Sequence, residues 1–274
     1  MEFLILLGKT LLLRPYVFFF LAIALATSVW FMGKPRTALF FLLTWATAFV
    51  CEFSSTRTGI PFGWYVYTGS TVGRELYLSD VPFMDSLSFS FLLFTSYCLA
   101  LTFLLPARGR GVTMVMRADQ SIRASRPVLG LTVMFFVLLD VVIDPVALRG
   151  DRWFLGKIYY YPDPGVHFGV PLANYLGWVV VGLIAFGLYQ RLDRRLPDHG
   201  RDENVARRLL FGCTLYYGIL AFNLAVTFWI DEPLIGMTGL LIYLPITAFL
   251  LLKLTGRLPL QIGARRRAVP KPAL

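Results

Sequence analysis

Residues 127–144 read PVLGLTVMFFVLLDVVID, an apolar run that ends in two aspartates one helical turn apart. A helix needs about 20 mostly apolar residues to cross the hydrocarbon layer of a bilayer. Comparable runs occupy residues 15–32, 37–53, 83–105, 171–190, 209–230 and 234–252. The sequence therefore predicts an all-α fold, a polytopic membrane helix bundle of about seven transmembrane helices, in a single integral membrane domain over residues 1–274.

The composition excludes several classes of protein. Hydrophobic residues make up 57% of the chain and charged residues only 15%, whereas soluble domains carry nearer a quarter charged residues. Two histidines are too few for the histidine-rich di-iron sites of membrane desaturases and hydroxylases. Cys51, Cys98 and Cys213 stand singly, without CxxC spacing, so they predict buried small side chains and neither a metal site nor a disulfide framework.

The basic residues are concentrated in a few connections between the spans. The loops at 106–126 and 191–208, residues 34–36 and a basic tail at about 253–274 together hold 19 of the 26 lysines and arginines. Such loops stay on the cytoplasmic side, which predicts an integral protein of the cell membrane with a cytoplasmic C-terminus. These cations are expected to contact anionic membrane lipid, and no nucleic-acid partner is expected. The run before residue 15 predicts an interfacial helix.

Three carboxylates lie at depths where ionisable groups are costly and usually functional. Glu52 ends the second span, and Asp140 and Asp144 end the fourth. Since the two aspartates are four residues apart, a continuous helix places them on one face. Burial and mutual repulsion favour the protonated acid, which suits a proton donor. The alternative is that these acids pair with arginines at the interface: Arg57, Arg74, Arg149 and Arg152.

The loops on the acidic side are unusually aromatic. Residues 60–69 and 151–178 are rich in Trp, Tyr, Gly and Pro, which is typical either of an aromatic belt at the headgroup level or of a lid whose rings stabilise a cation. Asn174 is expected either to hold a water molecule or to cap its helix. The candidate substrate-binding residues are Tyr65, Tyr67, Asp85, Trp153, Tyr160, Asn174 and Trp178.

Three ordered motifs resemble those of the membrane-embedded carotenoid 1,2-hydratases. The first is an acid at the end of a span followed by G-x-P-F-G-x-Y-x-Y, here Glu52 and then 59–67. The second is D-x-x-x-D-P-x-A at 140–147, and the third is W-x-x-G-x-x-Y followed by F-G-V-P-L-x-N-x-x-G-W between Trp153 and Trp178. In the third span, the polar string Asp85, Ser86, Ser88 and Ser90 departs from the family pattern.

The resemblance implies that water is added across the terminal C1,C2 double bond of an acyclic carotenoid such as lycopene or γ-carotene. The substrate would be a hydrophobic carotenoid. This chemistry needs a proton, a tolerated tertiary cation and one ordered water molecule, so no cofactor and no metal are expected. We expect Asp140 or Asp144 to act as the general acid and its partner or Glu52 as the base, with aromatic rings shielding the cation.

Three other functions remain open. Small membrane lycopene cyclases start from the same protonation, but that family carries a paired-glutamate P-x-E-E motif where this chain has residues 171–174, PLAN. A transporter would also use intramembrane acids, although neither an inverted repeat nor matching Gly or Pro interruptions are present. A structural protein that assembles other carotenoid enzymes is the third alternative, and it would tolerate loss of the acids.

Overall fold

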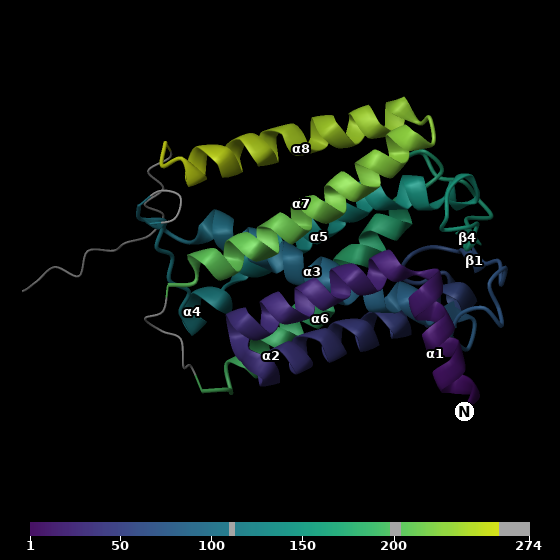
Figure 1. Cartoon of the computed structure of the whole chain (residues 1–274), viewed down its shortest axis with the longest axis horizontal. Coiled ribbons are helices and arrows are strands. Elements are labelled where there is room, and N and C mark those ends of the chain that lie inside the picture. The colour runs from purple at the N-terminus through teal and green to yellow at the C-terminus, as the bar shows by residue number, and fades with distance from the viewer. Residues whose placement is uncertain (110–112, 198–203, 258–274) are drawn as a thin grey trace, which may run out of the picture.

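The computed structural model describes residues 1–109, 113–197 and 204–257, and it is a bundle of long helices lying side by side (Figure 1). Within these residues, six helices are long and apolar enough to cross a membrane. The helices are α1 (Glu2–Leu13), α2 (Pro15–Thr58), α3 (Phe83–Leu104), α4 (Gln120–Arg123), α5 (Arg126–Ala147), α6 (Leu172–Asp193), α7 (Ala206–Trp229) and α8 (Pro233–Leu254). The expectation of an all-α membrane bundle is confirmed.

Helix α2 is folded back on itself, so its 44 residues form two antiparallel arms (Figure 1). The turn is at Gly33, whose φ of 80° and ψ of 163° are not helical. The hydroxyls of Ser28 and Thr37 lie 2.9 Å apart across the turn, and Phe31 and Phe40 from the two arms both pack on Tyr97. The two arms correspond to the predicted spans 15–32 and 37–53, which gives seven membrane-length segments.

Replacing Gly33 by alanine is expected to lower the free energy of unfolding by about 1–3 kcal/mol. The backbone at Gly33 lies in a region that is essentially restricted to glycine, and the added Cβ would meet only Pro35, at 4.0 Å. The cost is therefore conformational and not steric. Gly218→Ala is the matched control, because Gly218 is helical and open and alanine is the better helix former. Equal thermal unfolding temperatures in detergent for the two variants would contradict this account of the turn.

Helix α3 is the central element of the bundle. It packs against α2, α5 and α7, and residues 89–102 are buried without exception. Helix α8 lies at the edge, against α7 and α5 (Figure 1), and its exposed residues are all apolar, most of them leucine. A helix that is apolar on its exposed face suits a lipid environment.

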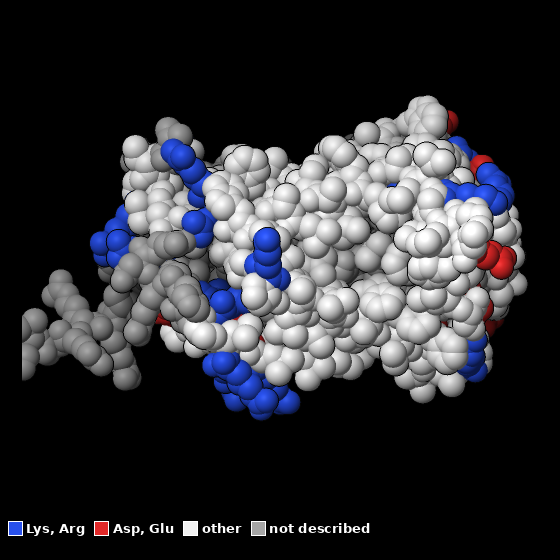
Figure 2. All heavy atoms as spheres, turned by 60° about the horizontal axis from the view of Figure 1, so that its bottom comes forward, with Lys and Arg blue, Asp and Glu red and all other residues white. Residues whose placement is uncertain are grey.

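The two ends of the bundle differ in charge, while the middle of the face in Figure 2 is largely uncharged. The predicted basic loops share one end: Asn204 Nδ2 donates to the Met114 carbonyl at 2.9 Å, and Gln120 Nε2 donates to the Asp193 carbonyl at 2.7 Å. That they lie on one face is thus confirmed. Lys253 is helical and buried, and it donates to the Phe103 carbonyl, so the predicted tail begins later than expected. Residues 258–274 lie outside the described part of the chain.

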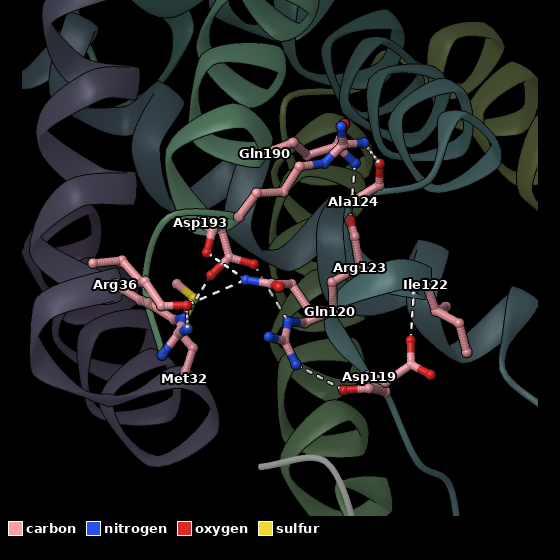
Figure 3. Close-up of polar contacts among 12 residues, drawn as sticks. Met32, Arg36, Asp119, Gln120, Ile122, Arg123, Ala124, Gln190 and Asp193 are labelled. Atoms are coloured by element: carbon pink, nitrogen blue, oxygen red, sulfur yellow. Dashed lines mark hydrogen bonds and ion pairs between the residues drawn. The ribbon is translucent and has the colours of Figure 1, made fainter. Parts of the chain in front are cut away.

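A buried carboxylate organises the basic end (Figure 3). The Asp193 side chain is only 1% exposed and accepts a 2.5 Å hydrogen bond from Arg36 Nε, with Arg123 Nε at 3.6 Å. Gln190 Nε2 donates to the Arg123 carbonyl at 2.9 Å. These contacts tie the turn of α2 to α4 and to the end of α6.

Candidate active site

A short ribbon covers the end of the bundle opposite the basic end. Strands β2 (Tyr77–Leu78) and β3 (Val81–Pro82) form one small hairpin. Strand β1 (Val66–Tyr67) pairs antiparallel with β4 (Tyr159–Tyr160), so the two aromatic loops predicted from the sequence lie against each other. Val66 faces Tyr160, and Tyr67 faces Tyr159. Because side chains alternate along a strand, every second residue of the ribbon points toward the helices.

Four tyrosines on the inner face of this ribbon form one aromatic cluster. Their contacting ring centroids lie 5.3–6.4 Å apart, all in edge-to-face arrangements. They are Tyr65, Tyr67, Tyr159 and Tyr161. Tyr160, the residue predicted from the sequence, lies on the outer face and is 41% exposed. That assignment was wrong in register, since Tyr159 and Tyr161 occupy the inner positions on either side of it.

Asp140 and Asp144 lie on one face of α5, as predicted, and Asn174 of α6 bridges them. Its Nδ2 donates to Asp140 Oδ2 at 2.7 Å and to Asp144 Oδ2 at 3.1 Å. Tyr161 donates to Asp144 Oδ2 at 2.8 Å, and Tyr159 donates to Asp144 Oδ1. Asp144 therefore accepts three hydrogen bonds, whereas Asp140 accepts one from the described residues. The Asn174 amide N–H groups are used on the two carboxyls, so this side chain holds the acids in place.

A second pair of acids meets at Tyr67. Its hydroxyl lies 2.7 Å from Asp85 Oδ2 and 3.2 Å from Glu52 Oε1, while Ser86 donates to Glu52 Oε2. A phenol has one proton to donate. The second contact is a hydrogen bond only if one of the two carboxyls is protonated and donates to the tyrosine oxygen. This arrangement favours at least one carboxylic acid in the pair.

The site contains two adjoining cavities, one lined mainly by polar groups and one lined mainly by apolar side chains. The polar cavity has a volume of about 350 Å³ and is lined by Glu52, Phe62, Tyr65, Tyr67, Asp85, Phe89, Asp144, Tyr159, Tyr161, Asn174 and Trp178. The apolar cavity, of about 760 Å³, extends between α2, α3, α5 and α7, and its wall includes Asp140 and Trp153. Asp85, Asp144, Tyr159 and Trp178 line both. Asp85 and Asp144 therefore stand where the two cavities meet, with Glu52 in the polar cavity and Asp140 in the apolar one.

No lysine, arginine or histidine of the described part of the chain lines either cavity. Three of the four arginines proposed as alternative partners of the acids bind elsewhere: Arg57 pairs with Asp80, and both Arg149 and Arg152 pair with Glu232. Arg74 is exposed and forms no ion pair within the described residues. The interfacial-pairing alternative is thus wrong for Glu52, Asp140 and Asp144.

The two predicted tryptophans also reach the cavities. Trp178 is stacked on Phe89, with centroids 4.1 Å apart, and packs on Phe136. Trp153 donates through Nε1 to the Val146 carbonyl at 3.0 Å, which leaves its ring as an apolar wall. The structure thus brings together Glu52, Tyr65, Tyr67, Asp85, Asp140, Asp144, Trp153, Asn174 and Trp178, and it leaves out Tyr160.

The hydroxyl groups of the ribbon tyrosines remain proton donors. Burial raises the pKa of both Tyr159 and Tyr161, and the negative charge of nearby Asp144 raises them further. Among the described residues, no three histidine, cysteine, aspartate or glutamate side chains come together as a metal-binding group. The chemistry that this arrangement offers is proton transfer between buried carboxyls inside an aromatic enclosure.

Tyr159 and Tyr161 were missed from the sequence although they lie in the run YYYP. Two facts together identify them: successive side chains of a strand point to opposite faces, and Val66 lies opposite Tyr160 in the ribbon. If Val66 faces away from the helices, Tyr160 does too, and Tyr159 and Tyr161 then face the helices. Nothing in the sequence indicates that pairing, since the partner strands lie about ninety residues apart in the chain.

Replacing Tyr159 by phenylalanine is expected to slow turnover by about 10-fold to 100-fold, because a hydrogen bond to a charged group contributes about 1.5–3 kcal/mol. Tyr160→Phe is the matched control one residue away, and it should leave turnover unchanged. Conversion, per folded protein, of the acyclic carotenoid that the sequence resemblance implies measures both variants. If the two variants lose activity equally, the inner and outer assignments of the ribbon are contradicted.

Comparisons with known proteins identify the family of this chain. Residues 13–245 match the sequence profile of a family described as carotenoid biosynthesis protein. The chain is 28% identical over 246 residues to the bisanhydrobacterioruberin hydratase of Haloarcula japonica, an alignment that covers 85% of this chain and 73% of that protein. No solved structure matches the chain.

Proposed function

Because this chain belongs to the carotenoid biosynthesis protein family, we propose that it hydrates the terminal C1,C2 double bond of an acyclic carotenoid end group. The observation that carries the proposal is the position of two neighbouring acids: Asp144 lines both an apolar cavity and a polar one, and Asp140 lines the apolar cavity one helical turn away. An alkene and a water molecule must meet beside a proton donor. The hydratase named among the relatives supports the same reaction class.

Asp140 is the proposed general acid. It lines the apolar cavity and not the polar one, and Asn174 is its one hydrogen-bond partner among the described residues. A carboxyl with few donors in an apolar wall favours its neutral form. It is therefore placed to deliver a proton to C2 of an alkene in the apolar cavity, which leaves a tertiary cation at C1.

Asp144 is the proposed base. Three donors stabilise its carboxylate form, and it lines both cavities. A water molecule from the polar cavity attacks C1 and loses a proton to Asp144, and proton transfer from Asp144 to Asp140 one turn away restores the starting state. Trp178 and Tyr159, whose rings line both cavities, stabilise the cation while it lasts.

The apolar cavity also gives the polyene a route from the bilayer. Its outer wall is formed by Tyr16 and Phe20 of α2 and Phe222 of α7, all of them partly exposed. The rings of Tyr16 and Phe222 are stacked with centroids 5.3 Å apart, and those of Phe20 and Phe222 lie 5.6 Å apart. A long hydrocarbon can enter sideways here without crossing water, because this seam faces the lipid.

Expression in bacteria that accumulate lycopene tests the proposal. The expected pigment has gained the mass of one water molecule at one or both ends with its chromophore unchanged. A product of unchanged mass and a blue-shifted spectrum would show a cyclase. If lycopene, γ-carotene and a C50 precursor were all recovered unchanged beside a folded protein, the hydratase proposal would be rejected.

A further inference from the structure

A groove at the basic end of the bundle, away from the candidate active site, is positively charged at one end and apolar along the rest of its length. We call it the arginine groove. It lies between the start of α5 and the end of α6, has a volume of about 900 Å³, and is lined by Ala124, Arg126, Leu129, Leu183, Ile184, Gly187, Leu188, Gln190, Arg191 and Arg194. The arginines lie at the helix ends and the aliphatic residues lie deeper along the same helices.

The charge of the arginine groove is not balanced by its own lining, which contains three arginines and no acid. Among the described residues, Arg126 and Arg191 form no ion pair and no side-chain hydrogen bond, while Arg194 Nη2 donates to the Ala124 carbonyl at 2.7 Å. The N-terminus of α5 at Arg126 has no side-chain cap. Its free N–H groups add to the positive potential at this spot.

The inner half of the arginine groove is apolar and open. Leu183 and Ile184 are each 45% exposed and Leu188 is 40% exposed. Gly187 lies beside them, and a Cβ built there would meet nothing within 4 Å. Because Gly187 has no side chain, the space between the neighbouring aliphatic side chains stays open. It forms a channel that runs from the arginines toward the middle of the bundle.

We propose that the arginine groove binds one anionic glycerophospholipid. The guanidinium groups of Arg126, Arg191 and Arg194 hold the headgroup phosphate, and an acyl chain lies along Leu183, Ile184 and Leu188 over Gly187. Charge complementarity selects an anionic headgroup, and the apolar channel selects a lipid over a soluble phosphate. The lipid joins the start of α5 to the end of α6, so binding stabilises the fold. This site is independent of the hydratase reaction.

Two kinds of variant separate a defined site from general attraction of a basic surface for anionic lipid. Arg126→Gln with Arg191→Gln removes the free charges, and its control is Arg207→Gln with Arg257→Gln, two exposed arginines at the same end. Gly187→Leu fills the channel without changing charge. Its control is Gly218→Leu, because Gly218 is equally open but lies on α7, outside the arginine groove.

The measurement is retention of phosphatidylglycerol by the purified full chain in native mass spectrometry, together with the rise in unfolding temperature relative to phosphatidylcholine. The charge variant and Gly187→Leu are each expected to bind about 10-fold to 30-fold more weakly, with both controls unchanged. Equal binding by Gly187→Leu and the unaltered chain would overturn the proposal. The proposal would also be overturned if the Arg126/Arg191 variant and the Arg207/Arg257 control lost equal amounts of lipid binding. The same holds if inorganic phosphate alone raised the unfolding temperature as much as phosphatidylglycerol does.

Discussion

Asp144→Asn is expected to lower carotenoid hydration by about 10²-fold to 10⁴-fold, the usual contribution of a positioned acid or base. Asparagine keeps the shape of the side chain but cannot take a proton from water. The change should leave the fold intact, because the hydroxyls of Tyr159 and Tyr161 can accept as well as donate hydrogen bonds and so pair with either end of an amide. Pigment conversion per milligram of folded protein is the measurement.

Asp80→Asn is the control for Asp144→Asn. Asp80 lies at the same end of the bundle in a half-exposed ion pair with Arg57, away from both cavities. It should retain full activity. Turnover at the normal rate in Asp144→Asn would remove this carboxylate from the mechanism, and an equal loss in Asp80→Asn would show that the effect is general to the acidic end.

Arg14→Met is expected to lower the free energy of unfolding by about 3–5 kcal/mol, because it leaves a buried carboxylate without its partner. Arg14 Nε and Nη2 lie 3.2 Å and 2.9 Å from the two Glu75 oxygens, and Nη1 donates to the Leu155 carbonyl. Both side chains are at most 1% exposed. Since Leu155 lines the apolar cavity, this pair joins α2 to the loop that covers the site.

Arg57→Met provides the comparison for Arg14→Met, since the Arg57–Asp80 pair is about 40% exposed on each side chain. Exposed ion pairs contribute less than about 1 kcal/mol. Thermal unfolding in detergent compares the two variants. A double variant, Arg14→Met with Glu75→Leu, should recover much of the loss because no buried charge remains unpaired. Similar unfolding temperatures for Arg14→Met and Arg57→Met would contradict the structural role of the buried pair.

The positions of the spans were predictable because each is a long apolar run with charged residues at its ends. The apolar run before residue 15 is helical, as α1 shows, and its position at the membrane interface stays a prediction. The sequence does not show why Arg14 is tolerated beside an apolar run. Its partner Glu75 lies 61 residues away, and only the packed structure brings the two together.

The sequence predicts those parts of the candidate site that depend on residues close together in the chain. It does not predict the parts that depend on how distant segments pack. Asp140 and Asp144 share a face because helical geometry puts residues four apart together. The meeting of Glu52 with Asp85 at Tyr67 joins two helices and a strand, and no spacing in the sequence indicates it. The register of β1 against β4 decides between Tyr159 and Tyr160, and pairing over that separation is a tertiary property.

Isotope incorporation by the purified protein tests the central claim most directly. In doubly labelled water, deuterium oxide whose oxygen is ¹⁸O, protonation followed by water capture predicts one deuterium on C2 and one ¹⁸O in the new C1 hydroxyl for each hydrated end. Asp144→Asn should yield neither label. A hydroxylated product whose oxygen is unlabelled, or whose C2 lacks deuterium, would contradict the mechanism.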